Sequence, residues 1–185
     1  MHTISGRGIR SVVALLGAGL LVGLTTSCSS SSPTREYAVP SDVCGTRVAR
    51  SLLEPLLPPG EKVSAQPTSS VGVKRCRILV DGKVVLSTSV EKHAANTSAG
   101  DVASSAYGVE PTDTRADGGH TIYSKTGAVR LVECPGSASA QSTVWATVRT
   151  SHDVKASSVR DFVKGYATAM GEGDACRALA TQGHA

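Results

Sequence analysis

The sequence is poor in aromatic residues, which limits how its core can be built. Only one Trp, one Phe and four Tyr occur among 185 residues. Aromatic side chains normally supply much of the apolar area that a core buries, so this core must depend on Val, Leu, Ile and Ala. Apolar residues make up 40% of the chain and charged residues 18%, a balance typical of globular rather than disordered proteins. We therefore expect one folded domain of ordinary size with appendages.

The chain also lacks a strong excess of charge of one sign. Its formal net charge of +4 includes Arg7 and Arg10. Without these two residues, the chain has 17 basic and 15 acidic side chains, a net charge of +2. Proteins that bind nucleic acid usually concentrate positive charge on one surface. The sequence therefore predicts no nucleic-acid partner.

No apolar run is long enough to cross a bilayer. The longest uncharged apolar stretch covers residues 11–24, which would form a helix of about 21 Å against a hydrocarbon core of roughly 30 Å. Arg7 and Arg10 precede it as a basic region. This arrangement predicts a signal peptide over residues 1–27.

The predicted signal peptide ends at a cysteine. Leu24-Thr25-Thr26-Ser27-Cys28 resembles the lipobox of bacterial lipoproteins, with Thr25 where Leu is commoner. The resemblance implies that Cys28 becomes the first residue, carries acyl chains such as palmitate, and anchors the protein to the outer, extracytoplasmic face of the cell membrane. The alternative is an ordinary signal peptide followed by an incidental cysteine. Residues 28–41 are expected to form a Ser-rich flexible tether, and residues 42–185 a single extracytoplasmic domain.

Four further cysteines follow, at Cys44, Cys76, Cys134 and Cys176. An even number in an exported domain predicts a disulfide framework rather than free buried thiols. Three pairings are possible, and the order of the expected elements favours Cys44–Cys76 with Cys134–Cys176. No C-x-x-C pair occurs, and the histidines show no spacing typical of zinc ligands, so neither a metal nor another cofactor is expected.

The apolar periodicity predicts an α+β fold. Helical spacing indicates a helix over residues 44–57, a short one over 100–107 and another over 157–173, where Ser158 and Asp161 would cap the start. Alternation around Asp81-Gly82 and Thr126-Gly127 indicates two hairpins, and residues 143–150 indicate a further strand. In the first hairpin, a three-residue loop that places Ile78 opposite Val84 gives the cleaner apolar face. We expect an antiparallel sheet of about four strands, with the N-terminal and C-terminal helices packed on one face.

The cysteine pattern carries a second resemblance. Cys44-Gly45, the Leu-rich segment after it, Cys76 at the head of a hairpin, Cys134-Pro135 and the late Cys176 look like actinobacterial lipoproteins of unknown function. The resemblance implies an extracytoplasmic α+β domain and brings no catalytic motif with it.

Several short motifs could carry chemistry. Ser89-Val90-Glu91-Lys92 matches the S-x-x-K of penicillin-binding enzymes, but the partner motifs S-D-N and K-T-G are absent, and a chain with this much serine matches by chance. Asn96-Thr97-Ser98 is a glycosylation sequon that we expect to be unused. Acidic residues gather between two histidines, in the order His93, Asp101, Glu110, Asp113, Asp117 and His120.

Two kinds of site follow from the charged residues. The acidic segment 92–120 could hold a general acid–base pair or a calcium loop, although its spacing fits no ligand pattern and a solvated loop explains it as well. Basic residues on the first hairpin, namely Lys74, Arg75, Arg77 and Lys83, could form a patch that faces anionic envelope polymer or lipid headgroups.

The sequence therefore predicts a membrane-anchored, non-enzymatic domain that binds a partner or ligand in the cell envelope. An envelope hydrolase that uses the acidic residues of segment 92–120, or an accessory subunit of an envelope complex, is the alternative. No residue pattern identifies the ligand.

Overall fold

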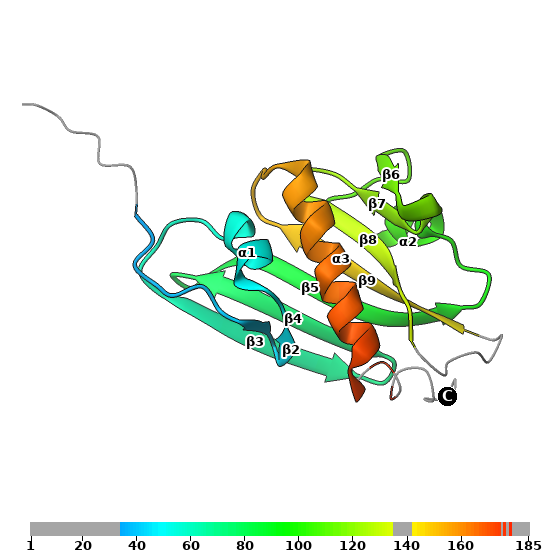
Figure 1. Ribbon diagram of the computed structural model, residues 1–185, viewed down its shortest axis with the longest axis horizontal. Helices are drawn as coiled ribbons and strands as arrows, with labels where there is room; N and C mark the ends of the chain where they lie inside the picture. Colours follow the sequence, from blue (N-terminus) through cyan, green and yellow to red (C-terminus); the bar gives the residue numbers. More distant parts are fainter. Residues whose placement is uncertain (1–33, 135–141, 175, 177, 179–185) are drawn as a thin grey trace, which may run out of the picture. The chain divides into compact units, whose positions relative to one another are not determined.

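The structure, a computed structural model, describes residues 34–134 and 142–174 together with residues 176 and 178 (Figure 1). Cys28, the signal peptide and the first part of the tether lie outside the described residues. No helix within the described part of the chain is both long and apolar enough to cross a membrane.

Helices pack on an antiparallel sheet, so the mixed fold that the sequence predicts is confirmed. The strand order is β3-β4-β5-β9-β8-β7-β6 (Figure 1). The strands are β3 Val63–Ser70, β4 Val73–Val80, β5 Lys83–Ala94, β6 Thr114–Ala116, β7 Thr121–Tyr123, β8 Gly127–Val132 and β9 Ser142–Thr150. The sheet therefore has seven strands among the described residues, and the expected number of about four is wrong. The edge strand β3 is polar and exposed along nearly its whole length, so it carries none of the apolar alternation that would predict it.

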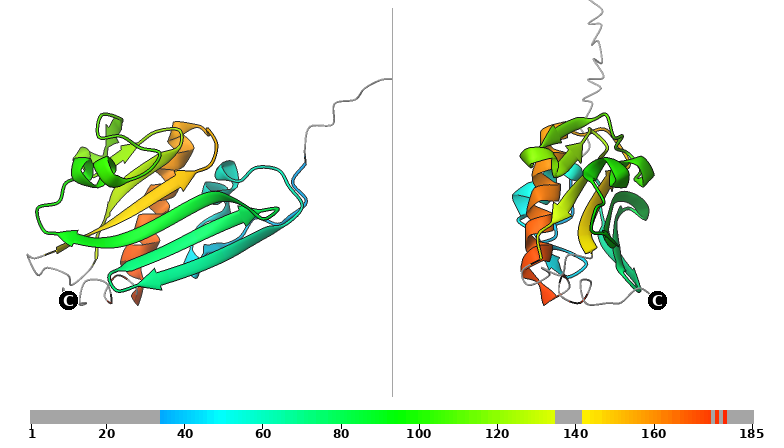
Figure 2. Two further views of the ribbon diagram at one scale, coloured as in Figure 1. Left: turned by 180° about the vertical axis from the view of Figure 1, so that it is seen from behind. Right: turned by 90° about the vertical axis from the view of Figure 1, so that its right-hand side faces the viewer.

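The helices cover the two faces of the sheet unequally. The long helix α3 (Ala156–Glu172) and the short helix α1 (Arg50–Leu53), which continues as the 3₁₀ turn η1 (Glu54–Leu56), pack on one face, as expected (Figure 1). The helix α2 (Ala99–Ser105) packs on the opposite face, over the strands β7, β8 and β9. The same face of the sheet continues over β3, β4 and β5. In the view from behind, these three strands lie toward the viewer and α3 lies behind the sheet (Figure 2, left).

The alternation along β9 divides its side chains between the two layers of core. Val144, Ala146 and Val148 contribute to the larger cluster beneath α3, whose own buried residues include Val159, Phe162, Val163, Tyr166 and Met170. Trp145 points to the other face and packs with residues of α2 and β8 in a smaller cluster. The two faces of β9 and the buried face of α3 follow the apolar spacing of the sequence. A period of two in a strand and of 3.6 in a helix fixes which side chains share a face.

The helix expected over residues 44–57 is much shorter in the structure. Residues before Val48 form a small hairpin of β1 (Asp42–Val43) and β2 (Thr46–Arg47), whose turn residues Cys44 and Gly45 both have positive φ. A turn of this kind suits a two-residue hairpin. Pro55 then confines the helical segment to α1 and η1, since proline cannot continue a helix from its interior.

The hairpin of β4 and β5 differs from the expected register. Asp81 and Gly82 both have positive φ and form a two-residue turn, which pairs Val80 with Lys83. A shift at Ile78/Leu79 then places Ile78 opposite Leu86 rather than Val84. The irregularity that produces one apolar face is therefore a β-bulge inside the ladder and not a longer loop.

Two disulfides join the elements in the favoured pairing. Cys44–Cys76 connects the β1–β2 hairpin to β4, with 5.8 Å between Cα atoms, and Cys134–Cys176 connects the end of β8 to the chain after α3, with 5.6 Å. They close segments of 32 and 42 residues, for which chain entropy predicts about 3.5–4 kcal/mol of stabilisation each.

The folded part begins earlier than the boundary at residue 42 that the sequence predicts. Arg35 pairs with Gly60 in a parallel bridge, and its guanidinium donates to the Glu54 carboxylate at 3.0 Å and to the Leu57 carbonyl at 2.6 Å. The Tyr37 hydroxyl donates to the carbonyl of Pro58 at 2.5 Å. These contacts hold residues 35–37 against the turn that follows η1.

Candidate functional site

A groove of about 530 Å³ lies on the sheet face opposite α3. Its floor is formed by β4, β5 and β9, and one wall is formed by α2 and the residues that follow it. A volume of this size is typical of sites that hold a small organic ligand. Three further cavities in the described part of the chain have volumes of about 230, 190 and 190 Å³.

Strand alternation makes the floor of this groove polar. Alternate side chains of β4 and β5 point toward α3, and the apolar ones among them, such as Ile78, Leu86 and Val90, join the core. The residues between them point into the groove. The polar side chains of the floor are Arg75, Arg77, Ser87, Ser89, Glu91, His93, Thr147 and Arg149.

Three of these residues form a row across the sheet. Arg77 on β4 is paired with Ser87 on β5, and Ser87 is paired on its other side with Arg149 on β9. Neighbouring strands are about 4.8 Å apart, so the Cα atoms of the two arginines lie roughly 10 Å from each other with the serine between them. We call Arg77, Ser87 and Arg149 the arginine row.

Among the described residues that line the groove, Glu91 is the one carboxylate, and it is already engaged in hydrogen bonds. Glu91 accepts hydrogen bonds from Arg75 at 3.0 Å and from the Ser89 hydroxyl at 2.5 Å. Partial burial opposes ionisation of Glu91, but these hydrogen bonds and the charges of Arg75 and His93 outweigh it and lower its pKa. Glu91 is therefore ionised at neutral pH.

The arginine row lacks such a partner. Within the described residues, no carboxylate forms an ion pair with Arg77 or Arg149. The Arg149 guanidinium instead lies over the ring of Tyr107, with 5.3 Å from its Cζ atom to the ring centroid. With three arginines against one glutamate, the groove has a net charge of +2 when His93 is neutral.

The wall formed by α2 is fixed by its N-terminal cap. The Ser98 hydroxyl accepts from the backbone N–H of Asp101 at 3.3 Å, and the Asp101 carboxylate accepts from the backbone N–H of Ser98 at 2.8 Å. This capping box satisfies donors that the helix leaves unpaired and lowers the pKa of Asp101. The corresponding cap predicted at Ser158 and Asp161 is wrong, because α3 begins earlier, with Lys155 at the N-cap and no side-chain cap.

The acidic residues of segment 92–120 do not gather in one site. Asp101 caps α2, and Asp113 accepts from the backbone N–H of Glu110 at 2.7 Å. His93 lies in the groove, whereas His120 follows the 3₁₀ turn η2 (Asp117–Gly119). Within residues 34–134, 142–174, 176 and 178, no three His, Cys, Asp or Glu side chains are grouped so that they could hold a metal ion.

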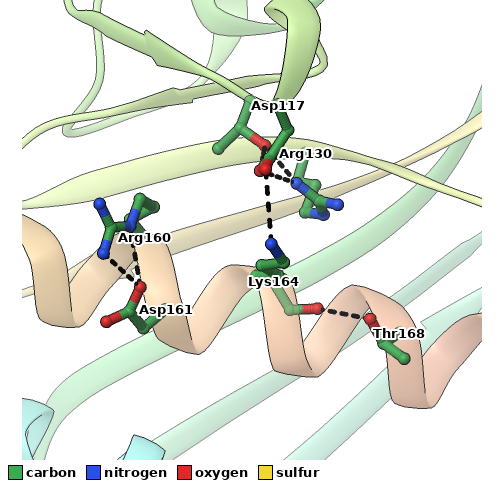
Figure 3. Close-up of polar contacts among 7 residues, drawn as sticks. Asp117, Arg130, Arg160, Asp161, Lys164 and Thr168 are labelled. Carbon is green, nitrogen blue, oxygen red and sulfur yellow. Dashed lines mark hydrogen bonds and ion pairs between the residues drawn. The ribbon is translucent and has the colours of Figure 1, made fainter.

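Asp117 forms a separate network, drawn in Figure 3. Its carboxylate accepts hydrogen bonds from the Arg130 guanidinium, from the Thr121 hydroxyl at 3.1 Å and from the Lys164 ammonium at 3.4 Å. Partial burial opposes ionisation of Asp117, but these hydrogen bonds and the two positive charges outweigh it and lower its pKa. The network joins η2, β8 and α3, so Asp117 is a structural residue of this fold.

The alternation of side chains along the strands also explains where the S-x-x-K match and the predicted basic patch lie. Ser89 and Lys92 are three residues apart on β5 and therefore point to opposite faces, whereas an S-x-x-K site needs them on one face of a helix. The predicted basic patch is also divided: Arg75 and Arg77 line the groove, and Lys74 lines a smaller cavity beside the Cys44–Cys76 disulfide.

Sequence reasoning did not identify Arg149 or Tyr107 as part of a site. Alternation along β9 puts Arg149 on the face shared with Trp145 and Thr147, but only the pairing of β9 with β5 brings it opposite Ser87. An excess of Arg, Ser and Thr at alternate positions of several strands is the signal that could have indicated a polar groove.

Comparisons of this chain with protein-family models, with curated proteins and with solved structures give no match.

Proposed function

We propose that this chain is a lipid-anchored extracytoplasmic lipoprotein whose folded part is a non-enzymatic binding domain of the cell envelope, with the groove of β4, β5, β9 and α2 as its ligand site. The observation that carries the binding function is the open, polar and positively charged floor of this 530 Å³ groove. The anchor is supported by the basic and apolar leader and by the lipobox that ends at Cys28.

The polar groups in the groove favour binding over catalysis. The Ser89 hydroxyl donates to Glu91, but a carboxylate with a lowered pKa is a weak base. His93 is four residues from Ser89 on the same strand, a separation of about 13 Å, which is too long for the hydrogen bond that a serine–histidine pair requires.

The hydrolase hypothesis receives less support. Asp101, Asp113 and Asp117 each accept hydrogen bonds that hold a helix cap, a turn or an element junction. A carboxylate that stabilises the fold in this way is a poor candidate for a general base that must change protonation during a reaction.

The anchor is tested by the intact mass of the protein isolated from its native membrane. We expect a mass that begins at Cys28 and includes acyl chains, and we expect Cys28→Ala to remain unacylated and to leave the membrane fraction. A wild-type chain that retains residues 1–27 and carries no acyl group would contradict the anchor.

The ligand site is tested by blocking the groove without changing its charge. Ser87→Trp places a bulky side chain on the floor, and Ser157→Trp is the matched control, because Ser157 is exposed at the start of α3 on the other face of the sheet. We expect native mass spectrometry of the full-length protein to detect a co-purified envelope molecule in the wild type and in the control but not in Ser87→Trp. Equal retention by both variants, or no bound molecule in the wild type, would count against the groove as the site. A stoichiometric protein subunit instead would support the accessory-subunit alternative.

A further inference from the structure

We infer that the arginine row binds a phosphate group of an organic phosphate ester, with the phosphate above Ser87 and the uncharged part of the ligand against Tyr107. This inference rests on the proposed binding function and adds the chemical class of the ligand. It follows from the positions of Arg77, Ser87 and Arg149 and from the charge balance of the groove.

The geometry of the row favours an anion that can be approached from two sides. Arg77 and Arg149 flank Ser87 on neighbouring strands, so their long side chains can converge on one group above the serine. Each guanidinium presents a planar fork of N–H donors that pairs with two oxygens of an anion. The Ser87 hydroxyl adds a donor between them.

The number of donors favours a phosphate over a carboxylate. A carboxylate has two oxygens, and one guanidinium fork occupies both of them. A phosphoryl group offers three strong acceptor oxygens, so it can bind both guanidiniums and the serine hydroxyl at once. The row therefore matches a tetrahedral anion more fully than a planar one.

The nearby glutamate does not oppose this assignment. Glu91 is four residues from Ser87 on β5, a separation of about 13 Å, and its charge is compensated by Arg75 at 3.0 Å. The other titratable group on the floor, His93, lies beyond Glu91 and adds positive charge when it is protonated. An anion above Ser87 thus lies at the positive end of the groove.

The size and the wall of the groove indicate that the phosphate belongs to an organic molecule. A cavity of 530 Å³ is far larger than inorganic phosphate requires. Tyr107 has 76% of its surface exposed, and together with Val102 and Ala106 it lines the groove beside Arg149. This wall offers an apolar and aromatic contact to the carbon part of a phosphate ester.

Two sources could supply such an ester, namely a soluble organic phosphate and the headgroup of an anionic phospholipid. The test uses the full-length chain in a non-ionic detergent and measures calorimetric binding of glycerol 3-phosphate, with acetate as the planar anion. In parallel, and without detergent, co-sedimentation of the Cys28→Ala chain, which lacks the proposed acyl anchor, with phosphatidylcholine vesicles is measured with and without about one-third phosphatidylglycerol. Groove-dependent binding in either arm supports the inference, and the arm that responds identifies the source.

The decisive variant is Arg77→Gln/Arg149→Gln, with Arg47→Gln/Arg50→Gln as the charge-matched control. Arg47 and Arg50 are exposed and do not line the groove. We expect at least tenfold weaker phosphate-ester binding in the groove variant and unchanged binding in the control. Arg77→Lys/Arg149→Lys keeps the charge but loses the forks, and we expect an intermediate loss. If the double variant does not fold by circular dichroism, the single variants Arg77→Gln and Arg149→Gln replace it.

The outcomes separate this inference from the proposed function. Equal losses in groove variant and control, acetate binding as tight as glycerol 3-phosphate, or no binding of either phosphate probe would overturn the phosphate assignment. If the Ser87→Trp variant still loses its co-purified ligand in that case, the groove remains a binding site for another class of molecule. If Ser87→Trp retains that ligand while phosphate binding depends on Arg77 and Arg149, the phosphate inference stands and the proposed native site is wrong.

Discussion

The hydroxyl of Thr88 on β5 donates a hydrogen bond of 3.2 Å to the hydroxyl of Tyr166 on α3, and both residues are buried. Thr88 lies between the groove residues Ser87 and Ser89 but points to the other face. Burial raises the pKa of Tyr166, although hydrogen bonds from Thr88 and Thr46 act in the opposite direction. The pair therefore connects the strand that carries the groove to the main helix through a neutral, buried contact.

We expect Tyr166→Phe to lower the free energy of unfolding by about 1–2 kcal/mol, because it leaves the buried Thr88 hydroxyl without its partner. Thr88→Val should lower the free energy of unfolding by a similar amount. The double variant should lose less stability than the sum of the losses of the two single variants. Chemical denaturation of the four proteins measures this coupling. Tyr107→Phe is the control, since the Tyr107 side chain is exposed. Strict additivity would mean that the two hydroxyls do not interact.

The Asp117 network predicts a specific dependence of stability on pH. The pKa of Asp117 is lowered from its ordinary value of 3.8, so the ionised form is favoured by folding. Its contribution is complete above that value and is lost as the pH falls through the lower pKa of the folded state. Asp117→Asn should therefore cost about 1 kcal/mol at neutral pH, and the difference from the wild type should narrow in acid.

The matched control for this prediction is Asp161→Asn, because Asp161 pairs with Arg160 on the surface of α3 (Figure 3). An exposed ion pair contributes little, so this variant should unfold like the wild type at every pH. Denaturation measured from neutral pH to about pH 2.5 distinguishes the two. Equal losses for both aspartates, or a gap for Asp117→Asn that widens in acid, would contradict the network.

Two glycines of α3 should respond differently to a methyl group. A Cβ atom at Gly171 would lie 2.4 Å from the backbone carbonyl oxygen of Glu133, whereas one at Gly165 would lie 2.5 Å from Cδ1 of Leu52, the end of a flexible side chain. Gly171→Ala should therefore lower the free energy of unfolding by about 1–3 kcal/mol. In Gly165→Ala, the higher helix propensity of Ala stabilises α3 by about 1 kcal/mol. This gain offsets the cost of moving the Leu52 side chain, so the free energy of unfolding should change little. Thermal denaturation of both variants measures the difference, and a stabilised Gly171→Ala would show that α3 can move away from β8.

If the groove binds phosphate esters, Glu91→Gln should strengthen that binding, because it removes the one negative charge from the floor. We expect a severalfold higher affinity for glycerol 3-phosphate at low salt and a smaller gain at high salt, where the charge is screened. Calorimetry at two salt concentrations measures both effects. Glu110→Gln is the control, since Glu110 is exposed and does not line the groove. Weaker binding in Glu91→Gln would show that Glu91 instead helps to position Arg75 on the ligand.

Local patterns were sufficient for several elements. The spacing of Val159, Phe162 and Val163 fixes the buried face of α3, and the alternation along β9 fixes its two faces. The position of the hairpin at Asp81-Gly82 and both disulfide pairings were also predicted, whereas the expected three-residue loop at that turn was wrong. The edge strand β3 was not predicted, because its form depends on pairing with β4 rather than on its own periodicity. The helix expected over residues 44–57 was too long, because its first residues form the β1–β2 hairpin instead.

The sequence by itself determined the predicted leader and lipobox, the even set of four cysteines, and the division of each central strand into an apolar and a polar face. Only the tertiary structure decided that Arg77 and Arg149, which are 72 positions apart in the chain, lie on either side of Ser87. The physical reason is that hydrogen bonds between strands, not local propensity, set which strands are neighbours and in what register. The strand register brings the residues of the candidate site together, whereas the sequence already contains the residue types that the site uses.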